Sequence, residues 1–261
     1  MSAGRSPLFD ISGRVAVVTG GAGRLGARFS TALAQAGAAV VVASRDGARR
    51  AALVDQLVAG GGEAFGIELD VTSERSVAGA VETVLARYGR VDVLVNNAGV
   101  ATPAPVEELS AAEWDRVMAV NARGPFLCAK AFGAPMVAKG AGSIINIASI
   151  YGVVAADQRM YGTTGRNSSL VYGASKAALI QMTRYLAAYW ADKGVRVNCI
   201  SPGGVFNDQE PEFLARYAAR VPVGRMAHRD EISAAVVFLA SDAASYLMGQ
   251  NLVIDGGLTL W

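Results

Sequence analysis

The sequence predicts a Rossmann-like α/β fold, in which a doubly wound parallel sheet carries helices on both faces. Three observations support this prediction. Short β-branched runs alternate with longer stretches rich in Ala and Leu, which is the rhythm of βαβ units. A glycine-rich turn follows the first of these runs. The 261 residues, 52% hydrophobic and 18% charged, show no internal repeat or compositional boundary, so we expect residues 1–261 to form a single domain.

The predicted strands are runs whose apolar residues are continuous rather than alternating, which is typical of parallel strands buried on both faces. None of these runs approaches the ~20 residues that a membrane-spanning helix needs, so we expect no membrane partner. In chain order the strands are Val15–Val18, Ala39–Val42, a run shortly before Asp70, Val91–Val95, Ser143–Ile147, Val195–Asn198 and Leu252–Ile254.

The predicted helices carry recognisable end signals. Ser73 precedes an acidic first turn, and Ser110 with Glu113 has the spacing of a capping box. One polar, aperiodic stretch, Ala155–Ser169, interrupts the alternation and is long for a connection, so we expect a lid or binding loop there. The helices are Leu25–Ala36, Asp46–Ala59, Ser73–Tyr88, Ala111–Val120, Val171–Asp192 and Asp230–Ala240.

Composition excludes several classes of function. The 24 basic and 22 acidic residues leave a net charge of +2 without clustering, so nucleic acid is not an expected partner. Cys128 and Cys199 are far apart in apolar contexts and predict buried thiols, while a single histidine, His228, argues against a metal site or a Ser-His-Asp triad. Residues 1–12 lack the pattern of a secretion signal, so we expect a cytoplasmic location.

The glycine-rich turn predicts a dinucleotide site. Gly21, Gly23 and Gly26 satisfy the spacing GxGxxG between the first strand and the first helix. Glycines there let main-chain N–H groups approach a pyrophosphate, whose charge is stabilised at the start of the helix. The expected contacts in this segment are Gly20, Gly21, Gly23, Arg24, Leu25 and Gly26.

The end of the second strand favours NADP(H), although NAD(H) is possible. An acidic residue there would bind the ribose 2′-hydroxyl, whereas a basic residue would bind a 2′-phosphate. Ser44 stands where a carboxylate would be expected, and Arg45 follows it. In the alternative interpretation, Arg45 is only a solvated side chain and Asp46 caps the next helix.

Tyr172 and Lys176 lie four residues apart, so a helix would place both side chains on one face. An ammonium near a phenol favours ionisation of the phenol and would lower its pKa from about 10. The pair alone is also compatible with an ordinary surface contact.

The whole set of motifs closely resembles the short-chain dehydrogenase/reductase family in its compact, single-domain branch. The resemblance covers roughly residues 8–258. It is carried, in chain order, by the Thr19-Gly20 turn, Asp70-Val71, Asn96-Asn97-Ala98-Gly99, Asn121, Ser149, Tyr172 with Lys176, Ser201-Pro202-Gly203, Gly249-Gln250 and Asp255-Gly256-Gly257.

This resemblance implies a catalytic set of Asn121, Ser149, Tyr172 and Lys176. Tyr172 would be the general acid/base, Lys176 would bind the nicotinamide ribose and lower the pKa of Tyr172, Ser149 would bind the substrate oxygen, and Asn121 would hold a water. It also implies a homotetramer. The remaining implied cofactor contacts are Ser44, Arg45, Asp70, Val71, Asn97, Ala98, Gly99, Tyr172, Lys176, Pro202, Gly203 and Val205.

Three departures from the family pattern concern the site. Arg24 replaces a glycine of the first turn, and Val205 stands near where a threonine often contacts the carboxamide. Ser149 and Tyr172 are 23 positions apart, about ten more than usual, which indicates an insertion. Its polar residues favour a hydroxylated substrate such as a sugar or cyclitol, or else form a solvated or subunit-contacting loop. The expected substrate contacts are Ser149, Tyr151, Gln158, Arg159, Tyr161 and Tyr172.

The predicted function is therefore NAD(P)-dependent interconversion of a secondary alcohol and a ketone on a small molecule. Two alternatives stay open at this stage. One is a dinucleotide-binding sensor or scaffold without turnover, and the other is a reductase of 3-oxoacyl thioesters within the same family.

Overall fold

A computed structural model describes residues 7–162 and 167–261 as one α/β unit built on a parallel sheet. The strand order β3-β2-β1-β4-β5-β6-β7 reverses direction between β1 and β4. In such sheets ligands bind at the carboxyl ends of the strands where the order reverses. The predicted fold is thus confirmed. The strands are β1 (Val15–Thr19), β2 (Ala39–Ala43), β3 (Ala64–Ile67), β4 (Val93–Asn96), β5 (Gly142–Ile147), β6 (Val195–Pro202) and β7 (Asn251–Ile254).

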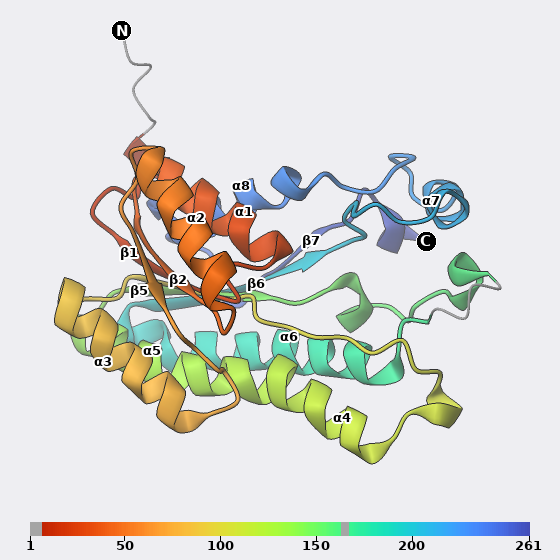
Figure 1. Ribbon diagram of the computed structural model, residues 1–261, viewed down its shortest axis with the longest axis horizontal. Coiled ribbons are helices and arrows are strands. Elements are labelled where there is room, and N and C mark those ends of the chain that lie inside the picture. Colours follow the sequence, from red (N-terminus) through yellow and green to blue (C-terminus); the bar gives the residue numbers. More distant parts are fainter. Residues whose placement is uncertain (1–6, 163–166) are drawn as a thin grey trace, which may run out of the picture.

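Two helical layers cover the sheet (Figure 1). Helices α1 (Arg24–Gln35), α2 (Gly47–Ala59) and α8 (Ser233–Ala240) lie on one face. Helices α3 (Glu74–Tyr88), α4 (Ala111–Met118), α5 (Gly124–Lys139) and α6 (Leu170–Trp190) lie on the other. Each face has its own hydrophobic core, the first including Phe29 and Leu33 and the second Phe132 and Met136. Burial on both faces explains why the central strands are apolar throughout.

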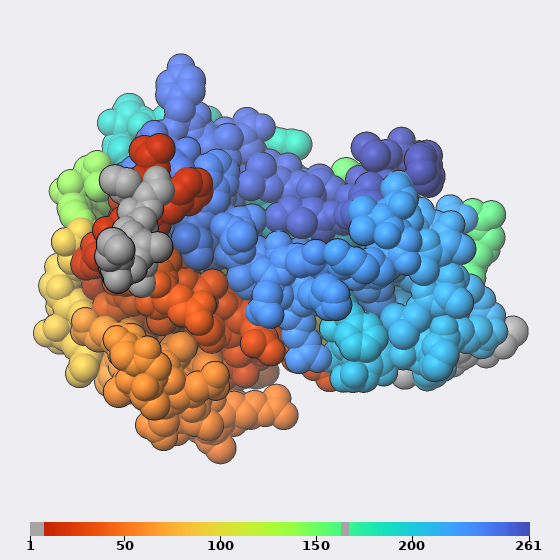
Figure 2. All heavy atoms as spheres, turned by 90° about the horizontal axis from the view of Figure 1, so that it is seen from above, coloured from red at the N-terminus to blue at the C-terminus, as the bar shows by residue number. Residues whose placement is uncertain are grey.

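Helix α7 (Pro211–Ala218) stands apart from these layers. In Figure 2 its light-blue segment forms a projection at one end of the molecule, away from the red and orange residues of α1 and α2. This helix was not predicted from the sequence, although Pro211 at its first position is a typical start signal. One of its eight residues, Tyr217, is buried, so this short helix gives little periodic apolar signal in the sequence.

The chain between α4 and α5 also differs from the prediction of a helix ending at Val120. Helix α4 ends at Met118, a wider π-helical turn covers Ala119–Arg123, and α5 continues to Lys139. Gly124 and Pro125 suggest a stop, but a proline is tolerated in the first turn of a helix, where its missing N–H would have no partner. Such π-turns occur frequently at functional sites.

The insertion predicted at Ala155–Ser169 contains a short 3-10 helix, Gln158–Tyr161. Residues 163–166 of this stretch lie outside the described residues. Across the described ranges, none of the helices combines the length and apolar character needed to cross a membrane.

Candidate active site

The glycine-rich turn between β1 and α1 is packed so closely that side chains would not fit at several positions. A Cβ atom at Gly26 would lie 2.1 Å from the carbonyl oxygen of Gly20, and one at Gly21 would lie 2.7 Å from that of Val18. Gly20 itself has a φ of +60°, in the left-handed region. Gly21 and Gly26 therefore serve the close packing of the turn, while Gly20 and Gly23 face a cavity.

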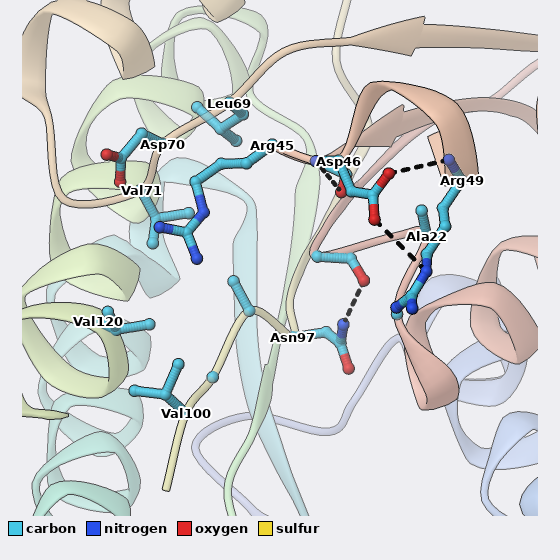
Figure 3. Close-up of a pocket in the computed structure, with 15 residues that line it drawn as sticks. Ala22, Arg45, Asp46, Arg49, Leu69, Asp70, Val71, Asn97, Val100 and Val120 are labelled. Atoms are coloured by element: carbon cyan, nitrogen blue, oxygen red, sulfur yellow. Dashed lines mark hydrogen bonds and ion pairs between the residues drawn. The ribbon is translucent and has the colours of Figure 1, made fainter. Parts of the chain in front are cut away.

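This cavity lies at the carboxyl ends of β1, β2 and β4 (Figure 3). It has a volume of about 290 Å³. The lining includes nine of the expected cofactor contacts, namely Gly20, Gly23, Ser44, Arg45, Asp70, Val71, Asn97, Ala98 and Gly99. Six further residues, which the sequence motifs did not predict, also line it: Ala22, Asp46, Arg49, Leu69, Val100 and Val120.

The expected contacts Arg24 and Leu25, and the more distant Pro202, Gly203 and Val205, are not part of the lining of this cavity. Arg24 is exposed at the first position of α1. Pro202 ends β6 and belongs to a second turn, described below.

Among the charged residues around the cavity, Asp46, Arg49 and Asp70 bind neighbouring residues, whereas Arg45 extends over the cavity. Asp46 caps α2 by accepting the N–H of Arg49 at 3.0 Å and also lies 3.4 Å from the Arg49 guanidinium, so the capping role considered for Asp46 is correct. The main-chain N–H and hydroxyl of Thr72 hold the pKa of Asp70 below its usual value. Arg45 is exposed, and Figure 3 shows its side chain extending across the cavity toward Val71.

Residues of this cavity fit the adenosine end of a dinucleotide. Close glycine packing leaves main-chain N–H groups at the start of α1 for phosphate oxygens, and apolar Leu69, Val71 and Val120 can contact a base. Arg45 supplies a cation at the rim.

Two polar networks fix this edge of the sheet. Thr19 Oγ1 accepts the main-chain N–H groups of Asn97 and Ala98 at 3.0 and 3.1 Å, and Asn97 Nδ2 donates to the carbonyl of Gly20 at 3.1 Å. The two turns that line the cavity are thereby tied together.

A second network ties the sheet to α6. Asn96 Nδ2 donates to Asn146 Oδ1 at 2.9 Å, and Asn146 Nδ2 donates to Thr183 Oγ1 at 2.8 Å. All three residues are buried, so these bonds set the position of α6 relative to β4 and β5. Asn146 and Thr183 were not predicted from the sequence, because their role exists only through contacts between distant segments.

Helix α6 brings Tyr172 and Lys176 to one face, as their spacing predicts. Lys176 is 5% exposed, and its Nζ donates to the carbonyl of Ile147 at 2.8 Å and lies 5.6 Å from the centre of the Tyr172 ring. Burial lowers the pKa of Lys176 to about 8. Lys176 is thus held beside the phenol by β5.

Ser149 lies two residues after β5, and its hydroxyl lowers the pKa of the Tyr172 phenol. Burial has the larger effect and raises this pKa above its usual value. The expected net lowering is therefore wrong for the protein by itself, since desolvation of the phenolate outweighs the stabilising contacts. A neutral phenol next to a serine hydroxyl can donate a proton to a substrate oxygen.

Asn121 lies in the π-helical turn and is fully buried. Its Oδ1 accepts the N–H of Val100, its Nδ2 donates to the carbonyl of Val100, both at 2.8 Å, and Nδ2 also donates to Ser175 Oγ at 3.1 Å. A Cβ atom built at Gly99 would lie 3.5 Å from Asn121 Oδ1 and 3.6 Å from Lys176 Nζ. Asn121 therefore holds the β4 turn next to the lysine.

The residues expected to bind substrate separate into two groups. Tyr151 and Tyr161 are partly buried, and their hydroxyls lie 3.1 Å apart. Gln158 is exposed and donates to the carbonyl of Ser168 at 3.3 Å. The Arg159 side chain is 79% exposed and bound to both carboxylate oxygens of Asp157 at 2.9 Å.

On the other side of the site, the turn after β6 rests against α7. Tyr217 Oη accepts the N–H of Gly204 at 2.6 Å, and a Cβ at Gly203 would lie 3.2 Å from the same oxygen. Tyr217 was not predicted as a site residue, because α7 itself was not predicted.

Comparison with known proteins agrees with this geometry. The profile of a family described as "Enoyl-(Acyl carrier protein) reductase" matches residues 21–259. The chain belongs to the short-chain dehydrogenase/reductase family. It is accordingly an NAD(P)-dependent oxidoreductase that interconverts a secondary alcohol and a ketone.

Three proteins illustrate the similarity. The chain is 41% identical to a D-threitol dehydrogenase of Mycolicibacterium smegmatis, over 97% of this chain and 95% of that one. It is 34% identical to an NAD-dependent glycerol dehydrogenase of Listeria innocua, over 97% and 96% of the two chains. The crystal structure of a gluconate 5-dehydrogenase from Burkholderia cenocepacia with NADP and tartrate superposes with a TM-score of 0.90 at 33% identity, covering 98% of both chains.

Proposed function

We propose that this dehydrogenase acts on a small polyhydroxylated substrate, such as a sugar alcohol, cyclitol or sugar acid. The observation that carries the proposal is a pair of phenolic hydroxyls, those of Tyr151 and Tyr161, on segments that adjoin Ser149. The Tyr151 and Tyr161 hydroxyls lie 3.1 Å apart, and the main-chain N–H of Tyr151 donates to Ser149 Oγ at 3.2 Å. Hydroxyl groups both donate and accept hydrogen bonds, so they suit a substrate with several hydroxyls better than an acyl chain. The names of the threitol, glycerol and gluconate enzymes support the same class.

We assign proton transfer to Tyr172. In ketone reduction its hydroxyl donates a proton to the substrate oxygen, and in alcohol oxidation its oxygen receives that proton. Ser149 orients the substrate oxygen and the phenol together. Lys176, held by Ile147, keeps a positive charge near the phenol, and Asn121 fixes the neighbouring turn and takes part in the relay of the proton toward solvent. The nicotinamide of the bound cofactor supplies or accepts the hydride.

The dinucleotide is proposed to occupy the cavity of Figure 3 with its adenosine end and to reach Pro202 and Gly203 with its nicotinamide. Main-chain N–H groups at the start of α1 would contact the phosphates, Ala98 and Gly99 the adenosine ribose, and Tyr172 and Lys176 the nicotinamide ribose. Leu25, Arg24 and Val205 are proposed as peripheral contacts.

We further propose a preference for NADP(H). Arg45 extends over the cavity, and position 44 holds a serine instead of a carboxylate. Arg45 can therefore pair with a 2′-phosphate. The NADP in the gluconate 5-dehydrogenase structure is consistent with this, whereas the glycerol dehydrogenase is named for NAD.

The two other functions considered are less well supported. A sensor without turnover has no need for a Ser149 hydroxyl that lowers the pKa of the Tyr172 phenol, or for Lys176 Nζ 5.6 Å from the centre of that ring. A 3-oxoacyl-thioester reductase needs an apolar path for its chain, whereas the hydroxyl of Tyr161 in the insertion meets that of Tyr151 in the turn after Ser149.

We propose a homotetramer, because large apolar side chains are exposed in two regions. Phe126, Tyr185 and Tyr189 lie on α5 and α6, and Tyr246, Leu260 and Trp261 lie toward the C-terminus. We also propose a reducing, cytoplasmic location, which suits the two buried free thiols Cys128 and Cys199. Light scattering coupled to gel filtration tests the assembly.

The function is tested with purified protein, NADP⁺ or NAD⁺, and a matched panel of threitol, galactitol, gluconate and cyclopentanol, with a 3-oxoacyl thioester assayed with NADPH. We expect kcat/KM for at least one polyol or sugar acid to exceed that for cyclopentanol at least tenfold. Preferred reduction of the thioester, or equal activity on cyclopentanol and the polyols, would contradict the proposed substrate class.

A further inference from the structure

The inserted segment and α7 share a small hydrophobic cluster of their own. It consists of the buried residues Met160, Tyr217, Val221 and Met226 and is separate from the two main cores. Met160, from the insertion, and Tyr217, from α7, are each 2% exposed. This cluster is the main apolar contact of the insertion among the described residues.

Two further contacts attach the insertion to this region. The ring centres of Tyr161 and Phe213 lie 5.4 Å apart, within the range of favourable aromatic pairs. Asp157 binds Arg220, just beyond α7, at 2.7 Å. Hydrogen bonds from Arg159 and the charge of Arg220 hold the pKa of Asp157 at about 2, so this link stays charged at neutral pH.

On its other side Tyr161 meets the turn of the catalytic serine. Its hydroxyl lies 3.1 Å from that of Tyr151, and the N–H of Tyr151 donates to Ser149 Oγ at 3.2 Å. Tyr161 therefore lies between the Ser149 turn and α7: its hydroxyl contacts Tyr151, and its ring packs against Phe213.

Helix α7 in turn supports the glycine pair after β6. Tyr217 Oη accepts the N–H of Gly204, and a Cβ at Gly204 would lie 2.7 Å from the Tyr217 ring. The carbonyl of Gly204 accepts the N–H of Ala227 at 2.9 Å, and the N–H of Gly203 donates to the carbonyl of Ile254 at 2.9 Å. The main chain of this turn is thus seated directly on the Tyr217 ring.

We propose that Tyr161 and Tyr217 are positioning residues, which hold the Gly203-Gly204 turn at a set distance from Ser149 and Tyr172. The path runs from Ser149 through Tyr151, Tyr161, Phe213 and Tyr217 to Gly204. The inference rests on the proposed placement of the nicotinamide beside Gly203. It assigns to the Tyr161 ring the support of α7, whereas the proposed substrate contacts involve the hydroxyls of Tyr151 and Tyr161.

The physical reason is the sensitivity of hydride and proton transfer to geometry. A displacement of about 1 Å between reacting groups can cost on the order of a hundredfold in rate. Within residues 7–162 and 167–261, the main-chain bonds of Gly203 and Gly204 run to β7, Ala227 and the Tyr217 hydroxyl, so the side away from β7 and Ala227 depends on Tyr217.

The first test uses Tyr217→Phe in the protein without cofactor. Removing the hydroxyl leaves the Gly204 N–H without its acceptor, so amide hydrogen exchange of residues 203–207 should accelerate at least fivefold. Tyr88→Phe removes a buried hydroxyl on α3 and should leave that segment unchanged. In the binary complex, Tyr217→Phe should weaken NADPH binding about fivefold, measured by fluorescence. Unchanged exchange and unchanged NADPH binding would overturn the role of Tyr217.

The second test separates positioning from substrate binding at Tyr161. Tyr161→Ala removes ring and hydroxyl, so exchange of residues 211–218 should accelerate, NADPH binding should weaken, and kcat should fall about tenfold for a polyol and for cyclopentanol alike. Tyr161→Phe keeps the ring against Phe213 and should restore the exchange rate and NADPH binding. Tyr161→Leu carries the same comparison if the alanine variant does not fold.

If Tyr161 only binds substrate, Tyr161→Phe and Tyr161→Ala will raise KM for a polyol equally and leave exchange in α7 and NADPH binding unaltered, which overturns the inference. Exchange and NADPH binding require no substrate. Failure of the polyol proposal is therefore distinguishable from failure of this one.

Discussion

The two halves of the site are built by different means. Around the dinucleotide cavity, short turns at β1, β2 and β4 present main-chain atoms, and glycines that admit no Cβ set their shape. On the proposed substrate side, side chains are presented by Tyr151 after β5, Tyr161 in the insertion and Tyr217 on α7. A cluster outside the main cores supports Tyr161 and Tyr217.

This difference teaches how one fold can keep its cofactor and change its substrate. Main-chain recognition of phosphates depends on close packing within the central sheet, so it tolerates little steric change. The substrate side can be rebuilt in the insertion and α7 without disturbing the cores of Phe29 and Phe132. Four predictions test this contrast.

The largest effect should come from Tyr172→Phe, which acts where the halves meet. Removing the proposed proton donor should lower kcat 10²- to 10⁴-fold, as for general acid/base residues, while the Kd for NADPH stays within twofold. Steady-state kinetics and fluorescence titration measure the two quantities. Tyr185→Phe, at a 66% exposed position of the same helix, is the control and should leave both unchanged. A Tyr172→Phe enzyme within tenfold of the natural kcat would assign the proton transfer to another group.

Lys176→Met should reveal how much the burial of the Lys176 charge lowers the free energy of unfolding. The folded pKa of about 8 lies below the unfolded value of 10.5, so between these values the unfolded chain binds a proton that the folded protein does not. The free energy of unfolding of the natural protein, relative to Lys176→Met, should therefore rise from pH 8 to pH 10.5, by roughly 3 kcal/mol. Urea unfolding at several pH values measures it. A pH-independent difference would show that Lys176 titrates as in the unfolded chain.

Gly26→Ala tests the steric basis of the dinucleotide half. Because its Cβ would lie 2.1 Å from the Gly20 carbonyl, the turn must shift, and we expect a loss of about 1–3 kcal/mol in stability together with weaker NADPH binding. Gly79→Ala on α3 has no neighbouring atom within 4 Å of its Cβ and should be neutral or stabilising by up to ~1 kcal/mol. Thermal unfolding with and without NADPH compares them. Equal effects of the two substitutions would refute the packing argument.

The smallest effect should come from the rim of the same cavity. Ser44→Asp places a carboxylate against the proposed 2′-phosphate, so the ratio of kcat/KM for NADPH over NADH should fall about tenfold or more. Arg45→Ala should lower the same ratio, whereas Arg49→Ala should change it less because Asp46 already pairs with Arg49. A natural enzyme that prefers NADH would show that Arg45 does not recognise a phosphate.

Features that depend on neighbours in the chain were predictable from the sequence alone. The β-branched runs, the glycine turn and the four-residue spacing of Tyr172 and Lys176 are local patterns, and the structure shows the strands, the packed turn and the shared helix face. Local sterics and helical periodicity determine them whatever the rest of the chain does.

Other features depended on contacts between distant segments, and only the tertiary structure decided them. The hydrogen bond between Asn121 and Val100 depends on a π-helical turn that no single residue predicts. The polar residues of the insertion divide into Arg159, paired with Asp157 at the surface, and Tyr161, packed between Tyr151 and α7. Their composition is equally suited to solvent, substrate or another helix. The packing of segments far apart in the sequence decides which of these a side chain contacts. A local sequence pattern does not predict that packing.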